Sequence, residues 1–337
     1  MNRRMHRSFP AVAALLSFAL LPSCKERPPA PPAVAGGGHA TESRAPTKSV
    51  SESVVPAQAP PVARPVEGAE VRAPYDLAAD RDARARTAKR ELGDRTVTAV
   101  VSDVFVVIGP PGWQGAAFDS SVSLFRNAMA GYMNGRFGKK PSEAISVYLF
   151  PNGPTYEAFC KKQYDAPCIA HFGFYQPRDR HMVMNAGLGL GTLTHEIVHP
   201  LVETDFPKAP TWLNEGIASV FEAPVISKPG EIHGVKNWRY PRLRRALSQA
   251  GEKDHARLDA LFSMSDETFR GDREDLNYAT ARYVCQWLDE RGKLWPFYHR
   301  WRDTVDDDPS GAKAFREVVG LTPEEAQVQW NKWLLAL

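Results

Sequence analysis

Residues 25–74 contain ten prolines and the triplet Gly36-Gly37-Gly38, and they lack Phe, Trp, Tyr, Leu, Ile and Met altogether. A segment of this composition cannot bury enough apolar surface to offset the entropy lost on ordering, so we expect residues 24–74 to form a disordered tether. The folded part must then lie within residues 75–337. This length is enough for a substantial hydrophobic core, either in one large domain or in two lobes that share a cleft.

Residues 1–23 show the three zones of a bacterial export signal: a basic stretch, an apolar stretch from residue 9 to residue 21, and a short polar end. The apolar stretch is too short for a membrane-spanning helix, which needs about 20 residues. The step from Leu21 to Cys24 resembles the lipobox of bacterial lipoproteins, which implies that Cys24 is lipidated after residues 1–23 are removed; a plain secretory signal is the alternative. We therefore expect an exported protein of the bacterial cell envelope, anchored to a membrane by its N-terminal lipid. Lys25 is not the aspartate that resembles an inner-membrane retention signal, which favours the outer membrane.

The charge balance argues against a nucleic-acid partner. The chain has 42 Lys and Arg against 39 Asp and Glu, and three of the arginines (Arg3, Arg4 and Arg7) lie in the predicted leader, so 39 charges of each sign remain. A neutral body without a basic block lacks the electrostatic footprint that a phosphate backbone requires.

Residue patterns within 75–337 predict an α+β fold, with a mixed β-sheet in residues 95–186 and a mainly helical part in residues 187–337. The individual predictions rest on β-branched runs, helical spacing of apolar residues and turn signals. They are a strand or hairpin at 97–108, a helix at 118–137, a strand at 145–150, a hairpin of 172–176 with 181–185, and a final helix that begins with a capping box at Thr322.

Cys160 and Cys168 flank a loop between a predicted helix and a predicted strand. In an exported protein this arrangement indicates a disulfide. Cys285 lies among large apolar residues and is expected to be a buried thiol. The cysteines have no partners at metal-ligand spacing, so none of them indicates a cysteine-based metal site.

Residues 195–199 read His-Glu-Ile-Val-His on a predicted helix. Residues four apart on a helix differ by about 40° around the axis and about 6 Å along it, so His195 and His199 lie side by side and could share one Zn²⁺. Glu196 is rotated by about 100°, which places it beside the metal rather than on it. There it can take a proton from the attacking water, which is the physical reason for the H-E-x-x-H spacing.

A second helical segment, residues 212–222, carries Glu215 sixteen positions beyond His199. A catalytic zinc needs three protein ligands and an open fourth position, and a carboxylate from a second helix supplies the third ligand. Gly216 and Ala218 would let this helix approach the metal-binding helix closely. Asp205 is the weaker alternative for the third ligand. Pro200 should make the metal-binding helix kink or end at His199.

Segments 195–199 and 212–222 together resemble the gluzincin metallopeptidases, the clan of thermolysin and related aminopeptidases, and especially the peptidase-MA-like members with a W-L-N-E-G-x-A signature. The resemblance covers roughly residues 145–300. It implies a zincin-like fold with one zinc ion per chain, held by His195, His199 and Glu215, and with Glu196 as general base and acid.

The same resemblance implies that the strand ahead of the metal-binding helix, residues 181–186, forms the edge of the cleft and binds the substrate backbone. Asn185 and Ala186 match the Asn-Ala step found on that strand in thermolysin-like enzymes. Tyr278, near the start of a later helix, resembles the aminopeptidase donor to the negative charge of the transition state. His233 is the alternative donor, and His171 and His181 are further candidates for the cleft.

These features predict a zinc metallopeptidase that cleaves peptide or protein substrates at the cell envelope. One alternative is a non-catalytic binding protein on a zinc-peptidase fold, although such a protein has no need of the Glu196 base. Another is zinc-assisted hydrolysis of a non-peptide bond, which would use the same residues.

Overall fold

The computed structural model describes residues 74–337. The predicted signal peptide, the predicted lipidation site Cys24 and the predicted tether up to residue 73 lie outside the described residues. Within the described part of the chain, no helix is both long enough and apolar enough to pass through a bilayer.

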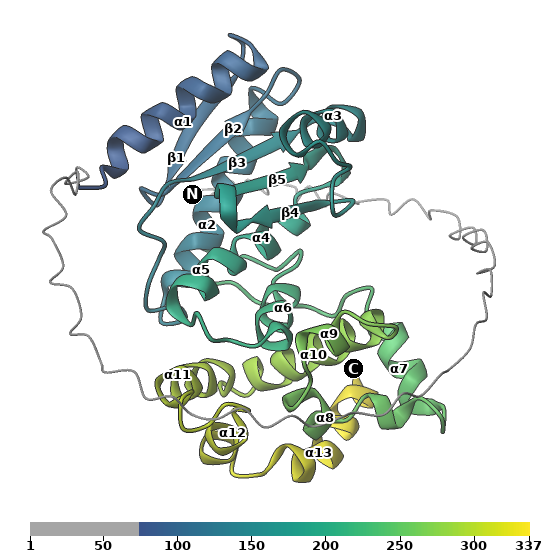
Figure 1. The fold of residues 1–337 in the computed structure, drawn as a ribbon. Helices are drawn as coiled ribbons and strands as arrows, with labels where there is room; N and C mark the ends of the chain where they lie inside the picture. Colours follow the sequence, from purple (N-terminus) through teal and green to yellow (C-terminus); the bar gives the residue numbers. More distant parts are fainter. Residues whose placement is uncertain (1–73) are drawn as a thin grey trace, which may run out of the picture. The chain divides into compact units, whose positions relative to one another are not determined.

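A mixed five-stranded β-sheet occupies the first half of the described chain (Figure 1). The strand order is β1-β2-β3-β5-β4; β2, β3 and β5 run parallel to one another, whereas β1 and β4 are antiparallel to their neighbours. The predicted mixed sheet within an α+β fold is thereby confirmed. The strands are β1 (Val97–Val101), β2 (Phe105–Gly109), β3 (Ile145–Phe150), β4 (Gly173–Gln176) and β5 (His181–Asn185).

The prediction that residues 181–186, with Asn185 and Ala186, form the edge of the sheet is wrong. β5 pairs with β3 on one side and with β4 on the other, so it is an inner strand. Asn185 and Ala186 are both 3% exposed. The edge strand on this side of the sheet is β4, because β5 continues the parallel part of the sheet and the hairpin then places β4 on its outer side.

Helices cover both faces of the central strands, which is why β2 and β3 are buried along their whole length. One face packs against α1 (Leu77–Leu92) and α3 (Gly153–Tyr164), and the other packs against α2 (Ala116–Met133). The sequence patterns did not predict α1, because Ala88 is the one buried residue that its sequence contributes.

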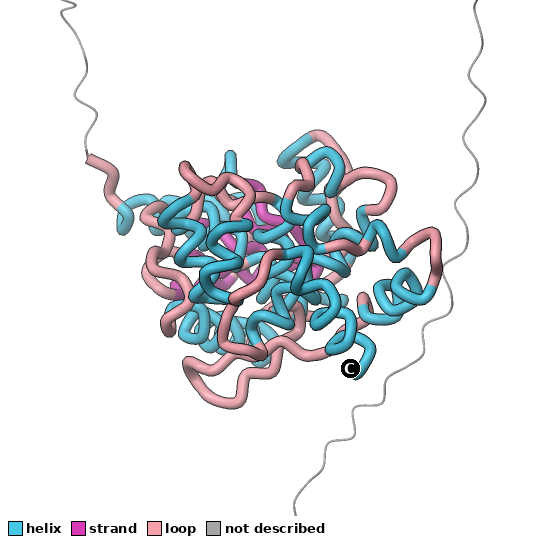
Figure 2. The backbone as a smooth tube through the Cα atoms, turned by 90° about the horizontal axis from the view of Figure 1, so that it is seen from below, coloured by secondary structure: helices cyan, strands magenta, loops and turns pink. Residues whose placement is uncertain are grey.

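The chain from Gly191 onward is mainly helical, as predicted. This part lies below the sheet in Figure 1, and in the view from below its helices lie in front of the strands (Figure 2). Its core includes four fully buried tryptophans, Trp212, Trp287, Trp301 and Trp330. The helices are α4 (Gly191–Glu196), α5 (Val198–Asp205), α6 (Thr211–Val220), α7 (Tyr240–Ser248), α8 (Leu258–Phe262), α9 (Asp266–Phe269), α10 (Glu274–Asp289), α11 (Leu294–Thr304), α12 (Ala312–Val319) and α13 (Pro323–Ala336), the last with the predicted capping box.

The helix that carries the His-Glu-Ile-Val-His segment is divided at Ile197 into α4 and α5. Pro200 has no N–H for the carbonyl of Glu196, so one helical hydrogen bond is missing there. Ile197 keeps right-handed helical dihedrals, with φ −60° and ψ −30°, and the helix continues to Asp205. The disturbance expected from Pro200 therefore lies two residues before His199, and the helix does not end at His199.

Gly216 permits a close helix contact, but with α10 rather than with the metal-binding helix. A Cβ atom on Gly216 would lie 2.8 Å from the Sγ of Cys285 and 2.9 Å from the carbonyl oxygen of Ala281. Both contacts belong to α10, which also carries Tyr278. The missing side chain of Gly216 thus sets the distance between the helices of Glu215 and Tyr278.

Replacing Gly216 by alanine is expected to lower the free energy of unfolding. Overpacking a filled core costs roughly 1–3 kcal/mol, which exceeds the gain of up to about 1 kcal/mol from a better helix former. Urea unfolding of G216A measures the difference. A Cβ atom on Gly251 would have no neighbouring atom within 4 Å, so G251A serves as the control and should stay within about 0.5 kcal/mol of the wild type. A G216A protein as stable as G251A would contradict the close contact.

Candidate metal centre

Three side chains from two neighbouring helical segments meet at one point. α4 and α5 supply His195 and His199, and α6 supplies Glu215; one potential ligand atom from each lies within 4.8 Å of the other two. The Nε2 of His195 and the Oε2 of Glu215 are 3.5 Å apart, and the two imidazole rings have centroids 5.0 Å apart. His195 and Glu215 are buried. This group could hold a metal ion.

Asn214 orients one of the histidines. The Nδ1 of His199 lies 3.0 Å from the Oδ1 of Asn214. In the tautomer with the proton on Nδ1, His199 donates to this amide oxygen and keeps the ring's lone pair on Nε2. Metal-binding histidines are held in this way by a partner on the second ring nitrogen. Asn214 therefore prepares His199 to bind a metal through Nε2.

Glu215 is held as an unprotonated carboxylate. Burial alone would raise its pKa, but the hydrogen bond with His195 and the positive charge of Arg270 hold the pKa of Glu215 well below its usual range. Arg270 donates from a terminal nitrogen to the Oε1 of Glu215 at 2.9 Å. The other carboxylate oxygen, Oε2, faces His195. The carboxylate is thus in the protonation state that a metal ligand requires.

Glu196 lies beside the three candidate ligands, with its Oε2 3.7 Å from the Nε2 of His199. Its side chain is buried, and burial raises the pKa of Glu196 to about 7; the carboxylate of Glu215 pushes it in the same direction, and His199 opposes the shift. A carboxyl group with a pKa near neutral pH can both accept and return a proton. Glu196 has the properties of a general base and acid.

The four residues open into a cavity of about 580 Å³. Segment 169–177, which includes the edge strand β4, borders the cavity on the side of the sheet, and residues of the helical part border it on the other side, among them Trp238, Arg239 and Tyr278. The backbone N–H of Tyr175 on β4 interacts with the Glu196 carboxylate. Glu196 therefore lies directly against the edge of the sheet.

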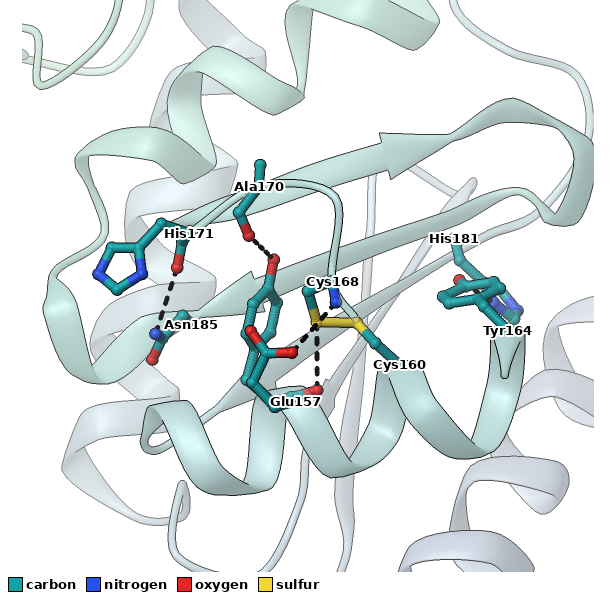
Figure 3. Close-up of a disulfide and its surroundings, with 9 residues drawn as sticks. Glu157, Cys160, Tyr164, Cys168, Ala170, His171, His181 and Asn185 are labelled. Atoms are coloured by element: carbon teal, nitrogen blue, oxygen red, sulfur yellow. Dashed lines mark hydrogen bonds between the residues drawn. A yellow bond between two sulfur atoms is a disulfide. The ribbon is translucent and has the colours of Figure 1, made fainter. Parts of the chain in front are cut away.

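Hydrogen bonds and a disulfide hold residues 168–171, of which 169–171 border the cavity, against the sheet and α3 (Figure 3). Cys168 forms a disulfide with Cys160 of α3, and its backbone N–H donates to Glu157 at 3.1 Å. The Tyr156 hydroxyl donates to the carbonyl of Ala170 at 2.6 Å, and the Asn185 amide donates to the carbonyl of His171 at 3.3 Å. Asn185 thus stabilises the backbone at the border of the cavity from the inner strand β5, instead of lying on an edge strand.

Tyr278 is in the cavity, and burial raises the pKa of its hydroxyl, which therefore remains a protonated donor at neutral pH. His171 also lines the cavity, whereas His233 and His181 are not among its lining residues. His233 pairs with Val225 in an isolated β-bridge. His181 lies on β5, 3.3 Å from the hydroxyl of Tyr164, and burial lowers its pKa to about 4.

Asp205, the alternative third ligand, lies at the end of α5 and outside the cavity. Both of its carboxylate oxygens accept from Arg302 of α11, at 3.1 Å and 3.0 Å. Its side chain is fully buried in this ion pair. Asp205 has a structural partner and does not belong to the candidate metal centre.

A family model described as "Protein of unknown function (DUF1570)" matches residues 189–303. The matched stretch begins just before α4 and ends within α11, so it includes all three candidate ligands, Glu196 and Tyr278. No match was found among curated proteins. The similarity therefore covers the candidate site and names no activity.

The sequence patterns missed several residues of the site. Arg270 follows the single-turn helix α9, where no periodic pattern marks it. Trp238, 69% exposed, and Arg239 belong to a loop, and the side chain of Arg239 pairs with Glu222. Asn214 precedes Glu215 directly and belongs to the W-L-N-E-G-x-A signature, and these two signals could have indicated its role beside His199.

Proposed function

We propose that this protein is a zinc-dependent hydrolase of peptide bonds, with a zincin-like fold of the gluzincin type. The observation that carries the proposal is the buried base Glu196 beside the ligand set His195, His199 and Glu215, all at the floor of one cavity. Two histidines and one carboxylate are a donor set typical of catalytic zinc. Zinc ligands about 2.1 Å from the metal in a tetrahedral site are about 3.4 Å apart, close to the 3.5 Å between His195 and Glu215.

When bound, zinc supplies a Lewis acid and lowers the pKa of water. Glu196 removes the proton from the attacking water and returns it to the leaving amine. Tyr278 donates its hydroxyl hydrogen to the oxygen on which negative charge develops. β4 offers its outer edge to the backbone of an extended peptide, in the manner of an added strand.

The place of action is also a proposal and rests on the residues before Pro74. Export by residues 1–23, lipidation of Cys24 and a proline-rich tether would hold the hydrolase at the bacterial envelope, on the outer membrane. Envelope peptides and proteins are the substrates within its reach.

The proposal is tested by incubating the purified protein with a mixed peptide library and analysing the products by mass spectrometry. We expect new peptide termini with zinc present and none after treatment with a chelator. Zinc binding without turnover of any peptide would instead favour the non-catalytic binding protein, and turnover of esters or amides alone would favour a non-peptide substrate.

A further inference from the structure

Arg270 contacts two groups of the proposed site at once. One terminal nitrogen of its guanidinium donates to the Oε1 of Glu215 at 2.9 Å, and the other donates to the hydroxyl of Tyr278 at 3.0 Å. Glu215 is the proposed third ligand, and Tyr278 is the proposed donor to the transition state. The two belong to different helices, α6 and α10, so the guanidinium bridges them.

The guanidinium is planar, and the directions of its N–H groups are fixed relative to one another. A contact on each terminal nitrogen therefore sets the distance and orientation between the Glu215 carboxylate and the Tyr278 hydroxyl. Because Arg270 occupies Oε1, the oxygen left towards His195 is Oε2. This arrangement selects binding of a metal through one carboxylate oxygen.

The base of the Arg270 side chain is itself held in place. The side-chain amide of Asn277, 4% exposed, donates to the carbonyl oxygens of Thr268 and Phe269 at 3.1 Å and 3.0 Å. The ring of Phe269 packs on the ring of Tyr278 with centroids 5.0 Å apart. Residues 268 and 269, which precede Arg270, are thus held against the start of α10, and the guanidinium of Arg270 extends from there into the cavity.

We propose that Arg270 is a positioning residue, an inference that rests on the proposed function. One terminal nitrogen of Arg270 orients Glu215 so that its Oε2 faces the metal, and the other terminal nitrogen aligns the Tyr278 hydroxyl. An ordinary exposed ion pair contributes little, but Glu215 is 7% exposed, and Arg270 is the partner of its Oε1 while Oε2 faces His195. Partners that orient a metal ligand in this way change metal affinity when they are removed.

The test measures the zinc dissociation constant by competition with a chromophoric chelator, with no peptide present. R270A is expected to bind zinc about 10–100-fold more weakly than the wild type. R270K should recover part of the loss, because an ammonium group keeps the charge but cannot hold two partners in a fixed geometry. In an E215A background, R270A should cause no further loss, since the partner through which it acts is gone.

One variant serves as the control. Arg242 of α7 is partly exposed and pairs with Asp275 and Glu252, outside the cavity, so R242A should leave zinc affinity unchanged. A folded R270A protein with the affinity of R242A would overturn the proposal, as would equal losses in R270A and R242A.

The outcomes separate this inference from the proposed function. Zinc affinity that depends on Arg270 in a protein that cleaves no peptide would leave the positioning role standing and refute the peptidase. Peptide cleavage by the wild type together with unchanged zinc affinity in R270A would refute the positioning role and leave the proposed peptidase standing. A wild-type protein that binds no zinc would refute both.

Discussion

Replacing Glu196 by glutamine is expected to lower kcat/KM for peptide hydrolysis by about 10²–10⁴ while the protein still holds one zinc per chain. Glutamine has nearly the same shape as glutamate but cannot accept the proton of the attacking water. Zinc content should not change, because Glu196 is not one of the three candidate ligands. Peptide kinetics and elemental mass spectrometry on the same preparation measure the two quantities together.

Glu203 provides a matched control for E196Q. It lies on α5, is exposed, and does not line the cavity, so E203Q should hydrolyse peptides at the rate of the wild type. If E196Q hydrolysed peptides as fast as E203Q, Glu196 would not be the base and the proposed chemistry would be wrong. Loss of zinc from E196Q would instead give Glu196 a role in metal binding.

The local part of this structure could be predicted from the sequence because local patterns determine it. The strand predicted at residues 145–150 is β3 in the structure, with the same bounds, and Thr322 is the N-cap of α13, as predicted. His195 and His199 face one point because of the geometry of a single helix. The prediction for Glu215 needed a second helical segment and the requirement of a catalytic zinc for a third protein ligand, and the resemblance to the gluzincins then agreed with it.

The parts that could not be predicted depend on pairing between distant segments. The apolar run at residues 182–184 indicates a strand, but it does not identify the neighbouring strand. The edge position predicted for Asn185 and Ala186 is wrong because β3 pairs with β5 on the other side from β4. In the same way, the missing side chain of Gly216 indicates a close neighbour without saying that the neighbour is α10. Arg270 reaches the site from an irregular segment, where neither helical nor strand spacing applies.

Replacing Glu215 by alanine is expected to weaken zinc binding by more than about 100-fold, since removal of an orienting partner alone costs about 10–100-fold. Two histidines would remain, which is one ligand fewer than catalytic zinc sites use. Elemental mass spectrometry should find one zinc per wild-type chain and far less in E215A. Thermal unfolding gives a second readout: zinc at a hundred times its dissociation constant adds about 2.7 kcal/mol to the stability of the wild type, and a chelator should remove that gain from the wild type alone.

D205N is the decisive comparison for E215A, because Asp205 is the other carboxylate that the sequence offered as third ligand. In the structure its two oxygens bind Arg302 instead. D205N should therefore lose stability, since the buried charge that Arg302 binds is removed, and should still bind zinc like the wild type. The opposite pattern, with zinc retained in E215A and lost in D205N, would move the third ligand from α6 to the end of α5. It would also leave Arg270 with no metal ligand to position.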